Sequence, residues 1–216
     1  MKCIIIGVGK VGYSLVANLC EEGHEVTVID SSRRRLDIME EHFNINIVEG
    51  NAAKLTTLRE ADIEHADLLI AVTEKDELNM VASFVAKNSG AASTIARVRN
   101  PGYSDFDDKS RMDALGIDML INPEKVSAEE IAKLLTYPEA HYVGFYGGGM
   151  MQMMELTVPD GCLRLGQQLA RLDMPAPCMI VGIYRENQLI IPKGHDMLES
   201  GDDILILANL TDIRKI

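Results

Sequence analysis

The chain has 216 residues, which predicts one large domain or two small ones, and 33 Asp and Glu against 21 Lys and Arg give a formal net charge of −12. A hydrophobic fraction of 47% with 25% charged residues excludes wholesale disorder, and the acidic balance argues against nucleic acid as a partner. No apolar run reaches the roughly 18 residues of a membrane-spanning helix, and the N-terminal MKCIIIG lacks a signal peptide's h-region. We therefore expect a soluble, cytoplasmic protein without direct membrane insertion.

Apolar runs alternate with helical patterns from residue 1 to about 136. The runs are rich in Ile, Val and Leu and nearly continuous, which is typical of parallel strands covered on both faces. Six strands are predicted, at 2–7, 25–30, 45–50, 67–73, 94–98 and 118–122. Helical patterns lie between them, near 11–22, 32–43, 54–61, 77–89 and 104–115. The alternation predicts an α/β fold for residues 1–136, with a Rossmann-like, doubly wound parallel sheet.

The pattern changes beyond the sixth strand. Ser127 and Glu130 fit a capping box, which predicts one more helix beginning there. After Pro138, strands are predicted near 141–146, 151–158, 178–185, 188–191 and 203–208, around one short helix near 164–172. Residues 137–216 are therefore expected to form a second, smaller α+β domain.

The strongest motif is Gly7-Val8-Gly9-Lys10-Val11-Gly12, a G-x-G-x-x-G that follows the first predicted strand and opens a helix. Gly7 allows a tight turn, Gly9 lets the backbone approach a pyrophosphate, and Gly12 permits close helix–strand packing. Asp30 ends the second strand, where a carboxylate can accept hydrogen bonds from both ribose hydroxyls of an adenosine. The alternative is a glycine-rich turn followed by an N-capping aspartate.

Asp30 also bears on the choice of cofactor. Its charge would repel a 2′-phosphate, which favours NAD over NADP. The three arginines at 33–35 could instead accept such a phosphate, or they could form a solvated first helical turn after Ser31 or Ser32. Arginines in a first turn oppose the helix dipole, so that placement is mildly unfavourable.

Three further segments follow predicted strands and should border the same crevice. Asn51 and Ala52 follow the third strand, Thr73 and Glu74 the fourth, and Arg97 lies near the end of the fifth. Ligands of open α/β sheets bind outside the carboxyl ends of the strands. Asn51 could bond an adenine edge and Arg97 a phosphate. Each residue alone fits an ordinary turn or edge position better, and it is their occurrence together at successive strand ends that favours a nucleotide site.

A catalytic role for a bound nucleotide finds little support. A dehydrogenase needs a proton-transfer group near the nicotinamide, and the second part offers only His141 and His195, neither in a recognisable constellation. We therefore expect no enzyme, no catalytic residue and no metal site. The rival hypotheses are an NAD-dependent oxidoreductase and a stand-alone nucleotide sensor that controls some other target.

The motifs together resemble the RCK (regulator of potassium conductance) family, in particular the TrkA and KtrA subunits of bacterial and archaeal potassium uptake systems. The N-terminal resemblance rests on IIIGVGKVG, VID, EGNA, DLLIAVTEKDELNM and IARVRNP. The C-terminal resemblance rests on VPDGCLRLGQQLARL, MIVGIYRENQLIIPKG and DMLESGDDILILA, which look like the family's C-terminal regulatory domain.

The resemblance implies a cytoplasmic gating subunit that assembles, from dimers, as a homo-oligomeric ring on a potassium-translocating membrane subunit of the TrkH or KtrB kind. The protein would lie peripherally at the inner face of the cell membrane. The family's nucleotide-contact positions fall on Gly7, Val8, Gly9, Lys10, Val11, Asp30, Asn51, Ala52, Thr73, Glu74 and Arg97.

The resemblance also leaves the ligand open between NAD(H) and ATP or ADP. Lys10 stands where many relatives carry an arginine, and Asn51 stands where an aspartate is usual. The second domain resembles modules that bind cyclic di-AMP in some relatives, which makes that a further possible ligand.

Overall fold

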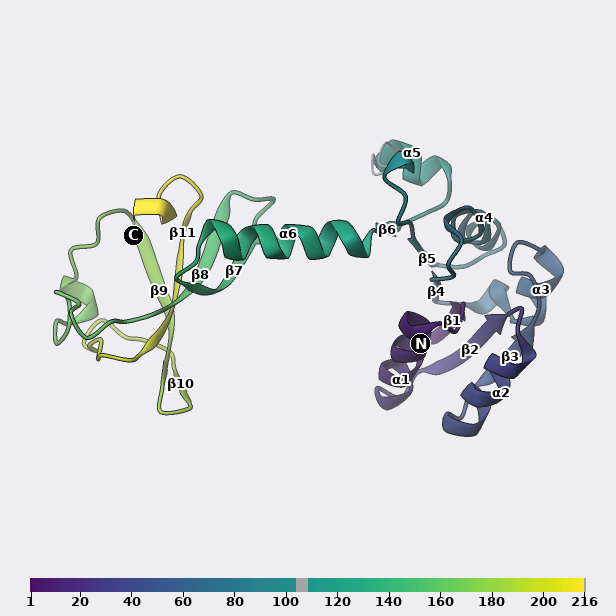
Figure 1. Cartoon of the computed structure of the whole chain (residues 1–216), viewed down its shortest axis with the longest axis horizontal. Coiled ribbons are helices and arrows are strands. Elements are labelled where there is room, and N and C mark those ends of the chain that lie inside the picture. The colour runs from purple at the N-terminus through teal and green to yellow at the C-terminus, as the bar shows by residue number, and fades with distance from the viewer. Residues whose placement is uncertain (104–108, 216) are drawn as a thin grey trace. The chain divides into compact units, whose positions relative to one another are not determined.

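The computed structural model describes residues 1–103 and 109–215, which divide into two compact units, Met1–Val126 and Ser127–Ile216 (Figure 1). The division falls within the helix that follows the last parallel strand. The strands of the first unit are β1 (Lys2–Ile6), β2 (Glu25–Asp30), β3 (Asn46–Glu49), β4 (Leu68–Ala71), β5 (Ser93–Arg97) and β6 (Met119–Ile121). Its helical elements are α1 (Lys10–Glu21), α2 (Arg33–His42), α3 (Leu55–Glu60), η1 (Ile63–His65), α4 (Asp76–Lys87) and α5 (Lys109–Ala114), and α6 (Pro123–Thr136) begins in it.

All six predicted strands pair in one parallel sheet, in the order β3-β2-β1-β4-β5-β6. The chain winds outward from β1 to β3 and then returns to continue on the other side of β1 with β4. The point between β1 and β4, where the winding reverses, is the topological switch point of a doubly wound fold. The Rossmann-like architecture expected for the first unit is confirmed.

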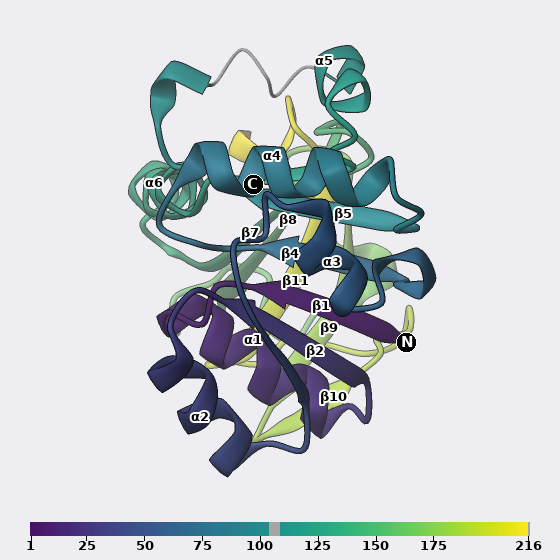
Figure 2. The ribbon, with the colours of Figure 1, turned by 90° about the vertical axis from the view of Figure 1, so that its right-hand side faces the viewer.

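Helices cover both faces of this sheet (Figure 2). On one face α1 and α2 pack on the strands, and Val16, Leu36 and Met39 are buried there. On the other face α3 and α4 supply Leu58 and Ala82 to a second apolar cluster. Burial on both faces explains the nearly continuous Ile, Val and Leu runs of the central strands β1, β2 and β4, because neither side of these strands faces solvent.

The structure tests two helix predictions of the first unit. The expected capping box at Ser127 and Glu130 is wrong, because α6 begins four residues before Ser127, at Pro123. The amide of Lys125 donates to Asn122 Oδ1 at 3.0 Å, so Asn122 caps the helix, and proline suits a first helical position. The helix expected at 104–115 is present as α5, and residues 104–108 lie outside the described part of the chain.

The second unit contains an antiparallel sheet in the order β10-β9-β11-β8-β7. Its strands are β7 (Ala140–Tyr146), β8 (Met151–Thr157), β9 (Cys178–Arg185), β10 (Gln188–Ile190) and β11 (Asp203–Asn209), with 3₁₀ turns η3 (Leu169–Arg171) and η4 (Ile213–Lys215). Val143, Met154, Ile183 and Ile206 form its buried core. The five predicted strands are confirmed.

The helix expected near 164–172 is reduced to the 3₁₀ turn η3. Gly166 has a φ of 69°, which a right-handed helix does not allow. The amides of Gly166, Leu169 and Ala170 donate to carbonyl oxygens of residues 198, 196 and 194 at 2.8–3.2 Å. The segment therefore combines short turns of its own with bonds to a stretch of chain that is distant in sequence, which periodicity alone does not reveal.

An ion pair anchors the segment LESGD, residues 198–202, in the second unit. Asp202 is 1% exposed and accepts hydrogen bonds from Arg185, Nε to Oδ1 at 2.7 Å and Nη2 to Oδ2 at 2.8 Å. The Glu199 amide also donates to Asp202 Oδ2, at 2.8 Å, and Arg185 donates to the Met197 carbonyl oxygen at 2.9 Å. Asp202 thereby ties β9 to the turn that leads into β11.

Candidate functional site

The loop between β1 and α1 has the backbone that the glycine motif predicts. Gly7 has a φ of 95°, a conformation that favours glycine. A Cβ on Gly12 would lie 1.9 Å from the Gly7 carbonyl oxygen, so the helix can approach the loop only without a side chain there. A Cβ on Gly9 would meet nothing within 4 Å. The backbone at Gly9 therefore borders open space.

The open space faces the N-terminus of α1. Gly9 is the N-cap residue and brings no side-chain cap, and the first turn carries no acidic residue. The first intrahelical hydrogen bond runs from the Tyr13 amide to the Gly9 carbonyl oxygen at 2.9 Å, so the amides of residues 10–12 have no partner within the helix. Free amides and the positive end of the helix dipole suit an anion such as a phosphate.

Asp30, at the end of β2, is tied to this loop. Its side chain accepts a hydrogen bond from the Val8 amide at 2.9 Å on Oδ2 and one from the Ser32 amide at 2.8 Å on Oδ1. The residue is 8% exposed, so the carboxylate is held in one orientation. Each oxygen retains a lone pair, which leaves the pair of acceptors that two ribose hydroxyls require.

A buried asparagine holds the ends of β4 and β5 together. Asn79, on α4, is 0% exposed, and its Oδ1 accepts from the amide and the hydroxyl of Thr73 at 2.9 and 2.7 Å. Its Nδ2 donates to the carbonyl oxygens of Thr73 and Arg97 at 3.0 and 2.8 Å. Arg97 Nη2 donates back to the Thr73 carbonyl oxygen at 2.8 Å. Sequence reasoning missed Asn79, although a polar residue on the buried face of a helix indicates a side chain that joins neighbouring segments by hydrogen bonds.

A cavity of about 610 Å³ lies at the carboxyl ends of the strands, beside the switch point. This volume falls in the range of about 300–1,000 Å³ that small-molecule sites occupy. Nine of the eleven predicted site residues line it: Gly7, Gly9, Lys10, Val11, Asp30, Ala52, Thr73, Glu74 and Arg97. The structure thus brings together residues of five strand ends in one concave site.

Two predicted residues do not line the cavity. Val8 contributes its backbone amide to Asp30 and is buried. Asn51 is exposed, and its Oδ1 accepts a hydrogen bond from the Ala53 amide at 2.9 Å. The Asn51 side chain therefore closes a local turn, which is one of the two roles that the sequence left open for it.

Cations outnumber carboxylates along the cavity wall. The cations are Lys10, Arg35, Lys75, Arg97 and Arg99, and the carboxylates are Asp30, Glu74 and Glu124. Hydrogen bonds from its own amide and from Arg99, at 2.5 Å, hold the pKa of Glu124 below its ordinary value. The Nε of Arg97 is buried without a hydrogen-bond partner among the described residues. The wall therefore has unused positive charge, which favours a phosphorylated ligand.

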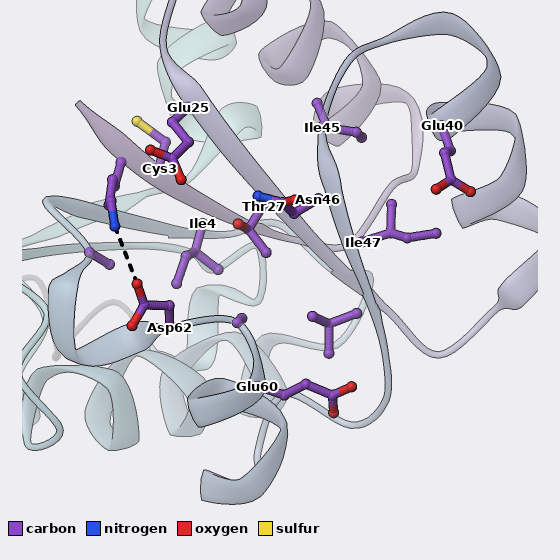
Figure 3. Close-up of a pocket in the computed structure, with 14 residues that line it drawn as sticks. Cys3, Ile4, Glu25, Thr27, Glu40, Ile45, Asn46, Ile47, Glu60 and Asp62 are labelled. Carbon is purple, nitrogen blue, oxygen red and sulfur yellow. Dashed lines mark hydrogen bonds and ion pairs between the residues drawn. The ribbon is translucent and has the colours of Figure 1, made fainter.

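A second cavity of the first unit has the opposite character. It measures about 550 Å³ and lies at the amino ends of β1, β2 and β3, where Glu25, Glu40, Glu60 and Asp62 line it (Figure 3). Its one lining cation in the described part of the chain, Lys2, pairs with Asp62 at 3.3 Å. No group of three or more His, Cys, Asp or Glu side chains within the described residues is placed to hold a metal ion. An anionic ligand is disfavoured here, so the cavity at the carboxyl ends is the candidate site.

Comparison with known families agrees with this geometry. The TrkA-N domain model matches residues 3–123, and the TrkA-C domain model matches residues 153–216. The chain belongs to the TrkA-N family. The candidate cavity lies wholly in the TrkA-N domain, apart from its last lining residue, Glu124. The resemblance seen in the motifs is confirmed for both domains.

Curated relatives extend the match over the whole chain. The Trk system potassium uptake protein TrkA homolog of Archaeoglobus fulgidus is 36% identical over 216 residues, which are 100% of this chain and 49% of that protein. The Trk system potassium uptake protein TrkA of Halomonas elongata is 36% identical over 220 residues, which are 100% of this chain and 48% of that protein. The chain therefore spans about half the length of the curated relatives it matches.

Solved structures share the fold. The GsuK RCK domain aligns with a TM-score of 0.65 and 15% identity over 99% of this chain and 46% of that chain. The GsuK channel bound to NAD aligns with a TM-score of 0.63 and 16% identity over 97% of this chain and 37% of that chain. In residues 1–103 and 109–215 of this chain, no helix has the length and apolar character of a membrane span.

Proposed function

We propose that this chain is the nucleotide-binding regulatory part of a potassium transporter, and that a nucleotide in the TrkA-N cavity gates potassium flux. The observation that carries the proposal is the cavity at the switch point, where the free amides of α1, the Asp30 carboxylate and a surplus of cations converge. The curated relatives named as Trk potassium uptake proteins supply the transport context.

The chemistry of the wall favours an adenine dinucleotide or mononucleotide. Asp30 offers two acceptors to ribose hydroxyls, and the N-terminus of α1 offers amides to a diphosphate. NAD(H) uses both features, and ATP or ADP uses them too. A GsuK channel bound to NAD and a GsuK bound to ADP share this fold, which supports either ligand.

Gating requires that the nucleotide bind two conformations with different affinity, and couplings of about 1–3 kcal/mol are typical. In this proposal the TrkA-N domain belongs to a homo-oligomeric ring docked on a potassium-translocating membrane subunit, peripheral to the cytoplasmic face of the membrane. The net charge of −12 disfavours direct contact with anionic lipid, so docking uses protein contacts.

In this proposal the nucleotide is bound without being turned over. Within the described residues, no His, Cys or Tyr lines the cavity, and its titratable carboxylates and lysines are Asp30, Glu74, Glu124, Lys10 and Lys75. If the chain is instead an NAD-dependent oxidoreductase, small alcohols or ketones will change the nicotinamide absorbance at 340 nm catalytically. Such turnover would refute the regulatory proposal, whereas binding without any effect on potassium flux would favour a stand-alone sensor.

The deciding experiment is a thermal-shift titration with NAD⁺, NADH, NADP⁺, ATP, ADP and cyclic di-AMP. A specific ligand at a hundredfold excess over Kd should stabilise its domain by about 2.7 kcal/mol. Asp30→Ala should abolish the shift from the nucleotide. Asp37→Ala is the matched control, because Asp37 is half exposed, does not line the cavity and pairs with Arg33 of the same helix, at 2.8 Å. If none of the six ligands shifts the transition, the proposed site is wrong.

The same titration addresses the second unit. A cavity of about 660 Å³ there is lined by segments 169–180 and 192–194. We propose it as the place for a second ligand, with cyclic di-AMP as the first to test. A shift from cyclic di-AMP that survives Asp30→Ala would locate that ligand outside the TrkA-N cavity.

A further inference from the structure

The three consecutive arginines at the start of α2 have different surroundings. Arg33 turns to its own helix, where Nε lies 2.8 Å from Asp37 Oδ1 and Nη2 lies 3.8 Å from Glu40 Oε2. Arg34 is exposed and is not part of the cavity wall. Arg35 lines the cavity. Of the three, Arg35 is therefore the one placed to meet a ligand.

Arg35 lies beside the carboxylate that we assign to the ribose. Its Nη1 is 3.9 Å from Asp30 Oδ2, which is an ion pair but too long for a hydrogen bond. The Arg35 side chain is 54% exposed, against 7% for that of Asp30. No hydrogen bond of the guanidinium group is found within the described residues. Its donors are thus available next to the position that Asp30 defines.

This pairing changes the electrostatics of the adenosine end of the site. A lone carboxylate repels a phosphate ester on the ribose that it binds, which is the usual reason such sites exclude 2′-phosphates. Here the guanidinium offsets the charge of Asp30 and can donate charge-assisted hydrogen bonds to a phosphate. Any group held by the Asp30 oxygens lies within reach of a cation 3.9 Å away.

We infer that Arg35 is the specificity-determining residue for a phosphate ester on the ribose of the bound adenine nucleotide. The site then admits 2′-phosphorylated nucleotides with only a modest preference for the unphosphorylated form, which Asp30 provides. The inference rests on the proposed nucleotide site, and it concerns which adenine nucleotides that site distinguishes.

The test compares ligands that differ only in the 2′-phosphate. Isothermal titration calorimetry with the full chain measures Kd for NAD⁺ against NADP⁺, and for AMP against adenosine 2′,5′-bisphosphate. The variants are Arg35→Ala, Arg35→Lys and, as the matched control on the same helix, Arg33→Ala. Far-UV circular dichroism checks that each variant is folded.

Wild type should bind the two members of each pair within about tenfold of one another. Arg35→Ala should weaken the 2′-phosphorylated member by about a further tenfold and change the other less than threefold, since one charge-assisted contact is lost. Arg35→Lys should fall between the two, because it keeps the charge without the fork of donors. Arg33→Ala should resemble wild type.

The inference and the proposed site fail in distinguishable ways. If Arg35→Ala weakens both members of a pair equally, or leaves both unchanged, Arg35 does not read the ribose phosphate. If Arg33→Ala reproduces the selective loss, the arginines act only as a diffuse positive charge. If wild type binds none of the four ligands, this inference is wrong, and the nucleotide site is wrong as well if NADH, ATP and ADP also fail to shift its thermal transition.

Discussion

Replacing Asn79 should destabilise the carboxyl ends of β4 and β5 where they border the cavity. The side chain is completely buried and makes four hydrogen bonds, three to Thr73 and one to the Arg97 carbonyl oxygen, at 2.7–3.0 Å. Both of those residues line the cavity. Asn79→Ala removes all four hydrogen bonds at once. The Thr73 amide and the Arg97 carbonyl group then lose the bonds that the Asn79 side chain makes to them.

The cost can be estimated from the contacts. One hydrogen bond contributes a net stability of roughly 0.5–1.5 kcal/mol, so the loss of four costs about 4 kcal/mol. The small cavity left by the missing side chain adds to this cost. Ser83 is the matched control, one turn further along α4. It is also 0% exposed, but its hydroxyl has no hydrogen-bond partner among the described residues. Ser83→Ala should therefore change stability by less than about 0.5 kcal/mol, or stabilise, because a buried unpaired hydroxyl is unfavourable.

Hydrogen–deuterium exchange by mass spectrometry suits the measurement, because unfolding of a two-unit chain is not a single two-state transition. Peptides from residues 68–99 should exchange much faster in Asn79→Ala than in wild type and at the wild-type rate in Ser83→Ala. The nucleotide-dependent thermal shift should also disappear in Asn79→Ala alone. If the protection free energies of these peptides differ by less than about 1 kcal/mol between the two variants, the Asn79 side chain does not hold the strand ends.

The remaining predictions concern the glycine loop and the second unit. Gly12→Ala should destabilise the first unit by about 2 kcal/mol or more, measured by hydrogen–deuterium exchange of its peptides, since its Cβ would lie 1.9 Å from a carbonyl oxygen. Gly9→Ala should leave that stability within about 1 kcal/mol and weaken nucleotide binding, because its Cβ enters the open space; equal effects on binding and stability in both variants would contradict this. Burial raises the pKa of Asp202, but hydrogen bonds from Arg185 and the Glu199 amide outweigh it and leave the pKa below its ordinary value. A pKa lowered by folding gives stability that is present above the unfolded pKa of about 3.9 and is lost as pH falls below it. The second unit should therefore weaken below about pH 4, and Asp202→Asn should be less stable at pH 7 and flatten this pH dependence in denaturation series; an unchanged slope would show that the ion pair does not carry it.

Much of the first unit follows from local sequence. The Ile- and Val-rich runs predict strands buried on both faces, and Gly7 and Gly12 predict a tight turn with close helix packing, which their φ and their contacts show. The site residues follow from one topological rule, since the residue after each parallel strand meets the others at one sheet edge. Asp30 and Arg97 could be placed in this way without any knowledge of side-chain contacts.

Other features depend on contacts between distant segments. Nothing in three successive arginines shows which one faces the ligand, because each residue rotates the side chain by about 100° and the helix start decides the direction. Asn51 fits an adenine contact as well as a turn, and the structure uses it for the turn. The 164–172 segment has a helical pattern, yet three of its amides donate to carbonyl oxygens of residues 194–198, which are distant in sequence.

The central place of β1 has a consequence for how the protein folds. The cavity wall runs from Gly7 to Arg97 and beyond, and its parts meet only after β1 has paired with β2 on one side and β4 on the other. Such non-local pairing requires loop closure over long stretches of chain before any contact is gained, which slows folding. An unfolded or half-formed unit therefore has no complete binding site. A nucleotide that binds here acts on the native sheet alone, so its concentration in the cell helps to set how much of the domain is folded.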